Sequence, residues 1–405
     1  MRLTPQELVL AYGDSETLIV YIEPEAATNQ EVSWSSDDAT IATVDDNGVV
    51  TAVGEGTATI MVTTDDGGHS DSASVTVTPL SVTGVSVTPH ELILADGDSK
   101  TLRADIEPEN ATDQEVSWSS DDDSIATVDG NGVVTAVGPG ETRITVTTND
   151  GGFSDTLTLT VPTSVGGTIN EDVTWRASDS PFWIASAVQI AESATLTIEP
   201  GSEFLSLPSG SNIIEVWGAL HAIGSAGHEI VFSGTMFVNN EGFINLTHVT
   251  ARDGNLASPL TSQLVLRHST IENFDGVSIF IDRSSLIEHN IFLNLGSLAI
   301  TGARDSAILN NYFEGYGPSL FTYTSVTETI KIHRNTFVES DAVVFEVRKN
   351  FSGGDLDARH NYWGTSDEER IRASILDNND DLNRSGEIIY SPFLTDPHPD
   401  TPTPD

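Results

Sequence analysis

The amino-acid sequence predicts an all-β protein, with two small β-sandwiches in tandem followed by a parallel β-solenoid. Three observations support this. Residues 1–163 contain two near-copies of one segment, in which short β-branched runs alternate with glycine-rich turns. The segment 164–395 repeats with a shorter period, roughly 22 residues long. Residues 396–405, DPHPDTPTPD, are rich in proline, which favours an extended and solvated tail.

The first repeat is a tandem duplication. The motif EVSWSSDD begins at Glu31 and again at Glu115, and other matched positions recur at the same offset. Strand-like runs such as TATIMVTT alternate with DDNG and DDGG turns, where glycine readily takes a positive φ. We therefore expect two copies of one sandwich domain, at 1–79 and 80–163.

Each copy has a single tryptophan, Trp34 or Trp118, within a predicted strand. One interpretation is an aromatic side chain that stacks on a sugar ring. The other is a large residue that fills the centre of the sandwich. The alternating pattern of the flanking residues favours the core position.

These copies resemble bacterial immunoglobulin-like domains of the Big group 2 type. The resemblance is carried by L-x-x-G-x-S-x-T-L, by the VSWSS strand, by the block IATVD-x-NGVVTAV and by the closing ITVTT-x-DGG. It covers each copy nearly end to end. The resemblance implies a spacer or adhesion module of surface proteins rather than an enzyme.

The second repeat carries a polar position once in every period. These anchor positions follow one another at sequence intervals of 21, 21, 24 and 26, and they are Ser269, Asn290, Asn311, Asn335 and Asn361. A period of this length built from short strands is typical of a parallel β-solenoid. We expect the four asparagines Asn290, Asn311, Asn335 and Asn361 to form a structural ladder, with their amides bonded along the axis.

Two apolar positions accompany each anchor. Three residues before it stand Leu266, Ile287, Ile308, Ile332 and Ala358. Two residues after it stand Ile271, Phe292, Phe313, Phe337 and Trp363. Both sets are expected to stack inside the solenoid, one residue per turn.

Residues 164–395 resemble the right-handed parallel β-helix domains of secreted and surface proteins. The opening segment GALHAIGSAGHEIVFSG and the closing segment ARHNYWGTSDEERIRASILDNNDDLN carry this likeness. It implies the fold but not one function, because that group includes polysaccharide lyases, hydrolases and adhesins. Within the closing segment, Ser366–Leu376 predicts an α-helix capped by Ser366 that covers the open end of the solenoid.

Catalysis by such a domain needs acidic side chains paired or clustered across neighbouring turns. Acidic residues near the predicted strands do not recur at matched positions; they are Glu272, Asp275, Asp282, Glu288, Glu339 and Asp341. The hydrolase patterns NTD, DD with GHG, and RIK are also missing. We therefore assign no catalytic residue and expect no enzyme, with polysaccharide cleavage as the alternative.

Basic side chains gather at the two positions before each anchor. We call this set the basic stripe: Arg267, His268, His289, His333, Arg334, Arg359 and His360. Stacked at about 4.8 Å per turn, they would form a cationic line on an acidic body. One interpretation is a contact for an anionic glycan or an acidic subunit. The other, which we prefer, is a set of ion pairs with adjacent acids together with some inward-facing packing.

A calcium candidate follows the predicted helix. Oxygen-bearing side chains alternate in DNNDDLN, at Asp377, Asn379, Asp381 and Asn383. A solvated turn explains the same pattern, and we prefer it. No cofactor is expected to be required.

Composition limits the partners. The 405 residues include 61 acidic and 17 basic ones, giving a net charge of −44, which excludes nucleic acid and anionic membranes as main partners. Cysteine is absent, and no apolar run is long enough to predict membrane insertion. The first residues do not resemble a signal peptide, so an export signal would lie outside this sequence. Only three of the basic residues are lysines, which suits a saline medium, although an ordinary acidic secreted protein fits too.

Together these features predict a non-catalytic extracellular or cell-surface structural or adhesive protein. The solenoid would be carried on immunoglobulin-like spacers, and it would self-associate into a fibre or coat. The alternatives are a polysaccharide-processing enzyme and a glycan-binding solenoid.

Overall fold

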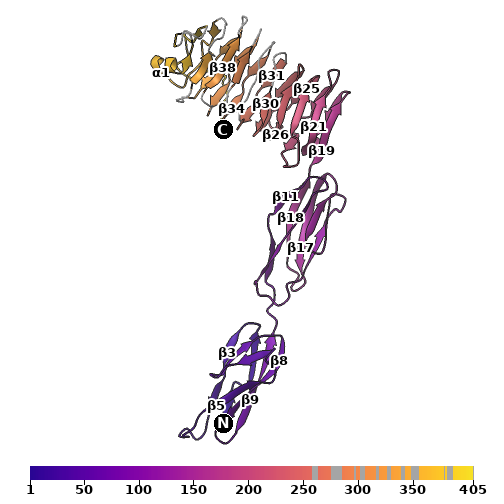
Figure 1. The fold of residues 1–405 in the computed structure, drawn as a ribbon, viewed down its shortest axis with the longest axis vertical. Coiled ribbons are helices and arrows are strands. Elements are labelled where there is room, and N and C mark those ends of the chain that lie inside the picture. Colours follow the sequence, from indigo (N-terminus) through magenta and orange to yellow (C-terminus); the bar gives the residue numbers. More distant parts are fainter. Residues whose placement is uncertain are drawn as a thin grey trace. The chain divides into compact units, whose positions relative to one another are not determined.

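The computed structural model describes residues 1–257, 263–274, 285–295, 298–301, 306–315, 319–325, 330–338, 343–347, 355–377, 379–380 and 386–404. The chain divides into two compact units, Met1–Val161 and Pro162–Asp405 (Figure 1). Each unit is built from strands, as the sequence predicts.

The first unit contains two copies of the same arrangement of sheets. In the first copy the four-stranded sheet has the order β2 (Glu7–Ala11), β9 (Ser70–Thr78), β8 (Gly56–Thr64) and β5 (Val32–Ser36). Two smaller sheets complete it: β3 (Ser15–Thr17), β7 (Val49–Ala52) and β6 (Ala42–Val44), and β1 (Arg2–Thr4) with β4 (Ile19–Tyr21).

The second copy repeats each sheet. Its four-stranded sheet has the order β11 (Glu91–Ile93), β18 (Ser154–Val161), β17 (Gly140–Thr148) and β14 (Val116–Ser120). The smaller sheets are β12 (Ser99–Thr101), β16 (Val133–Ala136) and β15 (Ala126–Val128), and β10 (Gly84–Val87) with β13 (Ala104–Glu107).

Alternating side chains create the core of each copy. In β8 every second residue is buried, so that Ala58, Ile60 and Val62 face inward. Trp34 and Trp118 are partly buried and pack against the cores of their own copies. This is the core position that the sequence favours over a sugar-stacking one.

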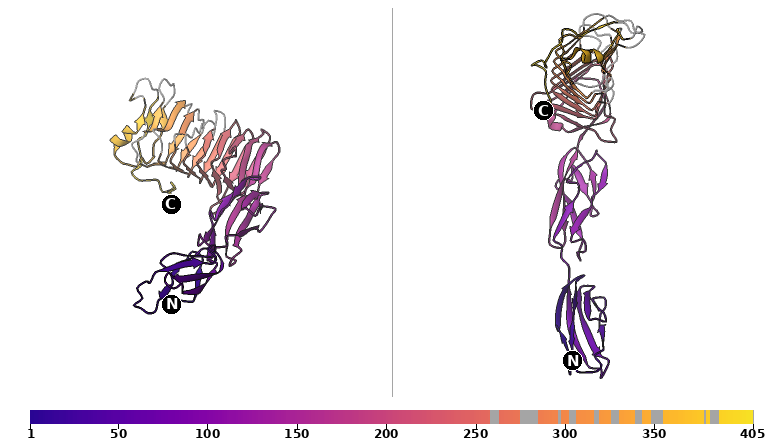
Figure 2. Two further views of the ribbon diagram at one scale, coloured as in Figure 1. Left: turned by 60° about the horizontal axis from the view of Figure 1, so that its bottom comes forward. Right: turned by 90° about the vertical axis from the view of Figure 1, so that its left-hand side faces the viewer.

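The second unit is a parallel β-solenoid, in which every described strand pair is parallel (Figure 1). One sheet stacks eight strands in the order β20 (Val173–Trp175), β22 (Thr195–Ile198), β25 (Ala219–Ile223), β28 (Phe243–Thr247), β31 (Gln263–Arg267), β33 (Leu286–Glu288), β36 (Ala307–Leu309) and β39 (Lys331–His333). Figure 2 shows the stacked strands from two further directions.

A twelve-stranded sheet continues around the rest of the turns, because β21 pairs at its two ends with two different strands. Along its path lie β30 (Asn255–Ala257), β27 (Met236–Asn239), β24 (Ile213–Val216), β21 (Phe182–Ile190), β23 (Glu203–Leu205), β26 (Ile230–Ser233), β29 (Val249–Arg252), β32 (Thr270–Glu272), β34 (Ile291–Leu293), β37 (Tyr312–Glu314) and β40 (Thr336–Phe337), with β19 (Thr163–Ile169) paired to β21. A four-stranded sheet contains β35 (Leu298–Thr301), β38 (Ser319–Ser325), β41 (Val343–Val347) and β43 (Ile375–Leu376), and β42 (Leu356–Asp357) pairs with β44 (Ile388–Ile389). A short 3-10 helix, η1 (Ala177–Asp179), precedes β21.

The apolar ladders follow the register expected from the sequence. Leu266 pairs with Ile287, and Ile287 pairs with Ile308. On the other side of the corner, the rings of Phe292 and Phe313 are parallel within 1°, with centroids 4.7 Å apart. These stacked side chains are buried, so each turn completes the core of the next.

The predicted helix is shorter than expected. It is α1 (Glu368–Ala373), and its N-cap is Asp367 rather than Ser366, because the Asp367 carboxylate accepts hydrogen bonds from the amides of Glu369 and Arg370. Ile375 and Leu376 are not part of the helix. They form β43, which pairs with β41.

The proline-rich tail makes one contact that the sequence does not predict. The Thr401 hydroxyl donates a hydrogen bond to the carbonyl oxygen of Arg334, at 2.9 Å. The tail therefore returns to the side of the solenoid at this point.

Candidate functional site: the corner of the solenoid

The basic stripe lies at a corner where the eight-stranded sheet passes into the twelve-stranded one. The residue directly before each of the five anchors takes a left-handed backbone conformation, and so does His248 one turn earlier, with φ between 47° and 60°; the five residues are His268, His289, Asn310, Arg334 and His360. Histidine and asparagine tolerate this conformation better than most side chains do. The repeated corner therefore brings one side chain per turn into a column.

Inside the corner lies the asparagine ladder. The Nδ2 of Asn290 donates to Oδ1 of Asn311 at 2.9 Å, and the pattern continues to Asn335 and Asn361 at 3.0 Å each. The same Oδ1 atoms accept backbone amides of the previous turn, as from Asn290 to Asn311. All four side chains are fully buried. Their hydrogen bonds join consecutive turns, which is a structural role.

Outside the corner three imidazole rings stack. The centroids of His248 and His268 lie 5.0 Å apart, and those of His268 and His289 are also 5.0 Å apart. Burial lowers the pKa of His268, and the neighbouring His289 and His248 lower it further. The neutral form of His268 is therefore favoured over the protonated form.

Two arginines of the stripe, Arg267 and Arg359, are paired with acids. Arg267 Nε lies 2.8 Å from Glu288 Oε1 in the next turn, and Arg252 forms the equivalent ion pair with Glu272. Asp357 binds both Arg359 at 2.8 Å and His333 at 3.1 Å. The hydrogen bonds from Arg359 hold the pKa of the Asp357 carboxyl well below its ordinary value.

The sequence predicted ion pairs without identifying which acids take part, although a signal was present. Glu272 follows Arg252 by the length of one turn, and Glu288 follows Arg267 by the length of the next. Because this offset matches the repeat, opposite charges at such a spacing meet side by side. The basic stripe therefore has acidic neighbours at two places, Glu288 beside Arg267 and Asp357 beside Arg359.

Among the described residues, the acidic side chains near the strands do not form a catalytic cluster. Glu272 and Glu288 are engaged by Arg252 and Arg267, while Asp275, Asp282, Glu339 and Asp341 lie outside the described residues. Within the part of the chain that the structure describes, no group of three His, Cys, Asp or Glu side chains is placed to hold a metal ion.

The calcium candidate is only partly described. Asp377 is buried, with 1% of its surface exposed. Its carboxylate accepts hydrogen bonds from Arg372 Nη2 at 3.0 Å, from the Asn379 amide at 2.9 Å and from the Ile388 amide at 3.0 Å. These bonds tie α1 to β44. Asp381 and Asn383 lie outside the described residues, so the calcium site stays a prediction.

No helix among the described residues is long and apolar enough to cross a membrane.

Known proteins match parts of this chain. An uncharacterized protein of Clostridium acetobutylicum is 34% identical over 154 residues, which cover 37% of this chain and 16% of that protein. An Ig-like virion protein of Serratia phage KSP90 is 35% identical over 165 residues, covering 40% of this chain and 64% of that protein. The chain thus spans less than two thirds of the length of either relative.

Among solved structures, domains 4 and 5 of the S-layer protein SbsC match 36% of this chain and 80% of that chain, at 20% identity and a TM-score of 0.22. The family model of the bacterial Ig-like domain (group 2) matches residues 1–77 and 81–161. The chain therefore carries two tandem bacterial Ig-like domains of group 2, followed by a parallel β-solenoid.

Proposed function

We propose that this chain is a non-catalytic, extracellular surface protein, whose solenoid is a rigid body carried on Ig-like spacers. The observation that supports this most directly is the use of the corner side chains. The ladder asparagines bond to each other, the imidazoles of three turns stack, and Arg267 and Arg252 bind acids one turn away. Histidine, arginine and acidic side chains, which often act in catalysis, here hold neighbouring turns together.

The Ig-like domains support a place on a surface. The Serratia phage relative is described as a virion protein, and a virion protein belongs to the particle that meets the outside medium. The acidic composition, with a net charge of −44, keeps such a body soluble in a salty medium.

We further propose that copies of this chain assemble into a fibre or coat. The basic stripe and its acidic neighbours present both signs of charge along one line, as in Arg267 beside Glu288 and Arg359 beside Asp357. A second copy with the same alternation can pair with it, whereas a uniformly acidic flank would repel that copy. Calcium bound at the Asp377 loop would be an accessory to this role and not a requirement.

Electron microscopy and sedimentation of the purified full chain test the proposal. We expect ordered filaments or sheets once NaCl reaches about 1 M, where the Debye length is ~3 Å, and no release of reducing ends from polysaccharides. A chain that stays monomeric at every salt concentration would contradict assembly. Cleavage of any polysaccharide would contradict the non-catalytic role.

A further inference from the structure

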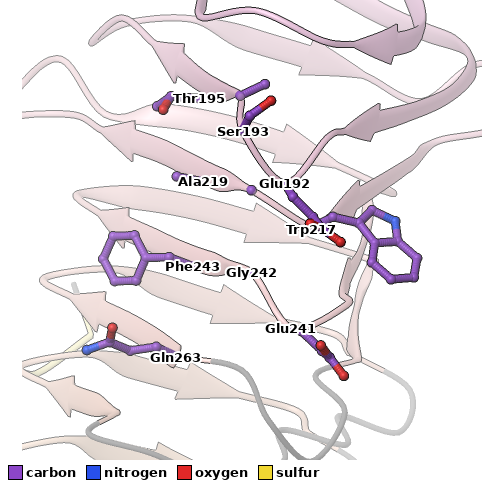
Figure 3. A pocket seen from close by; sticks show the side chains of 11 residues that line it. Glu192, Ser193, Thr195, Trp217, Ala219, Glu241, Gly242, Phe243 and Gln263 are labelled. Carbon is purple, nitrogen blue, oxygen red and sulfur yellow. The ribbon is translucent and has the colours of Figure 1, made fainter.

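A hollow on the solenoid lies away from the basic stripe, at the turns that lead into β22, β25, β28 and β31. Its volume is about 560 Å³, which is within the range of small-molecule sites. Figure 3 shows its lining, with Trp217, Glu192 and Glu241 toward one side and Phe243 toward the other.

The hollow has a floor of backbone. Because Thr195 pairs with Ala219 and Ala219 pairs with Phe243, the residues before them are also aligned from turn to turn. Two of these are Gly218 and Gly242. A Cβ on Gly218 would overlap the carbonyl oxygens of Ala191 and Ala194, and one on Gly242 would lie 2.5 Å from the carbonyl oxygen of Gly218. Glycine at both positions therefore lets the neighbouring turns approach closely, and the lining of the hollow between Thr195, Ala219 and Phe243 is backbone at these two places.

An exposed aromatic ring stands at the rim. Trp217 is 45% exposed, although tryptophan usually buries most of its surface. Its backbone is fixed, since its amide donates to the carbonyl oxygen of Ile190 at 3.0 Å. The indole therefore presents a face to solvent from a rigid turn, which is how proteins offer a stacking platform.

Two exposed carboxylates flank this ring along the solenoid. Glu192 belongs to the turn before Trp217, and Glu241 belongs to the turn after it (Figure 3). Glu241 has a φ of 71°, a left-handed conformation that is strained for glutamate and that glycine or asparagine would adopt more easily. A glutamate kept at this strained corner points to a use for its carboxylate.

The indole and the two carboxylates indicate which kind of ligand fits the hollow. An aromatic face binds the apolar face of a sugar ring, and carboxylates accept hydrogen bonds from its hydroxyl groups. An anionic sugar would be repelled by Glu192, by Glu241 and by the net charge of −44. We propose that this hollow binds an uncharged glycan through a pyranose ring that stacks on Trp217. The proposal goes beyond the structural role above and does not depend on it.

Isothermal titration of the full chain with neutral hexasaccharides tests this site. The probes are cellohexaose, maltohexaose and mannohexaose, with hexagalacturonate as the anionic comparison, in about 0.15 M NaCl, where the Debye length is ~8 Å and the salt stays below the concentration at which we expect assembly. We expect at least one neutral probe to bind. Trp217→Ala should weaken that binding about tenfold, and Trp217→Phe should weaken it less, because a smaller ring still stacks.

The matched control is Ile223→Ala, which removes another exposed apolar side chain, 43% exposed, from the end of β25. It should bind the glycan as the wild type does. The proposal is overturned if no neutral probe binds, if Trp217→Ala binds as well as the wild type, or if hexagalacturonate binds more tightly than every neutral probe. Assembly and polysaccharide cleavage are measured separately, so failure here leaves the proposed structural role standing.

Discussion

His268 shows how one residue depends on its column. Its ring lies between those of His248 and His289, at 5.0 Å from each. A proton added to the middle ring meets burial and two neighbouring imidazoles that resist a second charge, and Glu288 offsets this only in part, since the overall pKa shift is downward. The folded state therefore holds this proton less readily than the unfolded chain does.

The lowered pKa of His268 predicts that the protein loses stability in mild acid. Well above pH 6.5, the ordinary pKa of histidine, His268 is neutral in both states and has no effect on the free energy of unfolding. Below it, the unfolded chain is protonated first, so the free energy of unfolding falls as the pH drops. We expect His268→Asn to lose less stability than the wild type between pH 7 and pH 5 in urea unfolding experiments.

Asparagine is the matched replacement, because Asn310 occupies the same corner position two turns later with a φ of 55°. The other histidines remain in the variant and serve as an internal control. If the free energy of unfolding falls equally with pH in the variant and the wild type, the His268 ring is not the cause of the loss of stability.

At the scale of an element, the asparagine ladder replaces side-chain packing by hydrogen bonds along the axis. Asn311 accepts the amide of Asn290 at 2.9 Å and donates to the carbonyl oxygen of Ile287 at 2.9 Å. Both groups belong to buried backbone, so each needs this partner.

Asn311→Ala should lower the free energy of unfolding of the solenoid by about 3 kcal/mol, because at least two buried backbone groups lose their partner. Asn311→Ser should lose less, since Ser269 holds the equivalent place earlier in the ladder and accepts the amide of Val249 at 3.0 Å. Thermal and urea unfolding measure both.

The control is Asn294→Gly. Asn294 is exposed and has a φ of 53°, which glycine adopts without strain. Its loss should change stability by less than about 1 kcal/mol. If Asn311→Ala were as mild as this control, the ladder would not be a source of stability.

The sequence predicted the solenoid well where a feature repeats once per turn. The spacing between Asn290 and Asn311 is enough to give the register of the strands beside them. Prediction from the sequence failed where two adjacent residues could both cap the helix, and where a strand partner lies far away in the chain. Ser366 and Asp367 are both good N-caps, and Ile375 leaves the helix because Phe345, far earlier in the chain, offers it a strand partner. The hollow escaped notice because glycine at positions 218 and 242 resembles ordinary turn chemistry until the neighbouring turns are in place.

At the scale of the whole molecule, charge dominates. The sequence has 61 acidic residues against 17 basic ones, and the basic residues include only three lysines. Ion pairs such as Arg267 with Glu288 and Arg372 with Asp377 engage part of the positive charge within the solenoid. The excess acids remain and repel one another, which destabilises the compact state when salt is low.

Salt should therefore stabilise this protein through screening. Between about 0.1 M and about 1 M NaCl the Debye length falls from ~10 Å to ~3 Å, so most of the repulsion disappears in that interval. We expect the midpoints of thermal unfolding to rise by about 5 °C or more across it, and to rise little above it. Sucrose is the control, because an excluded uncharged solute stabilises without screening and its effect grows steadily with concentration. Midpoints that do not change with NaCl below about 1 M, or that climb at the same rate above it, would contradict a saline adaptation based on charge.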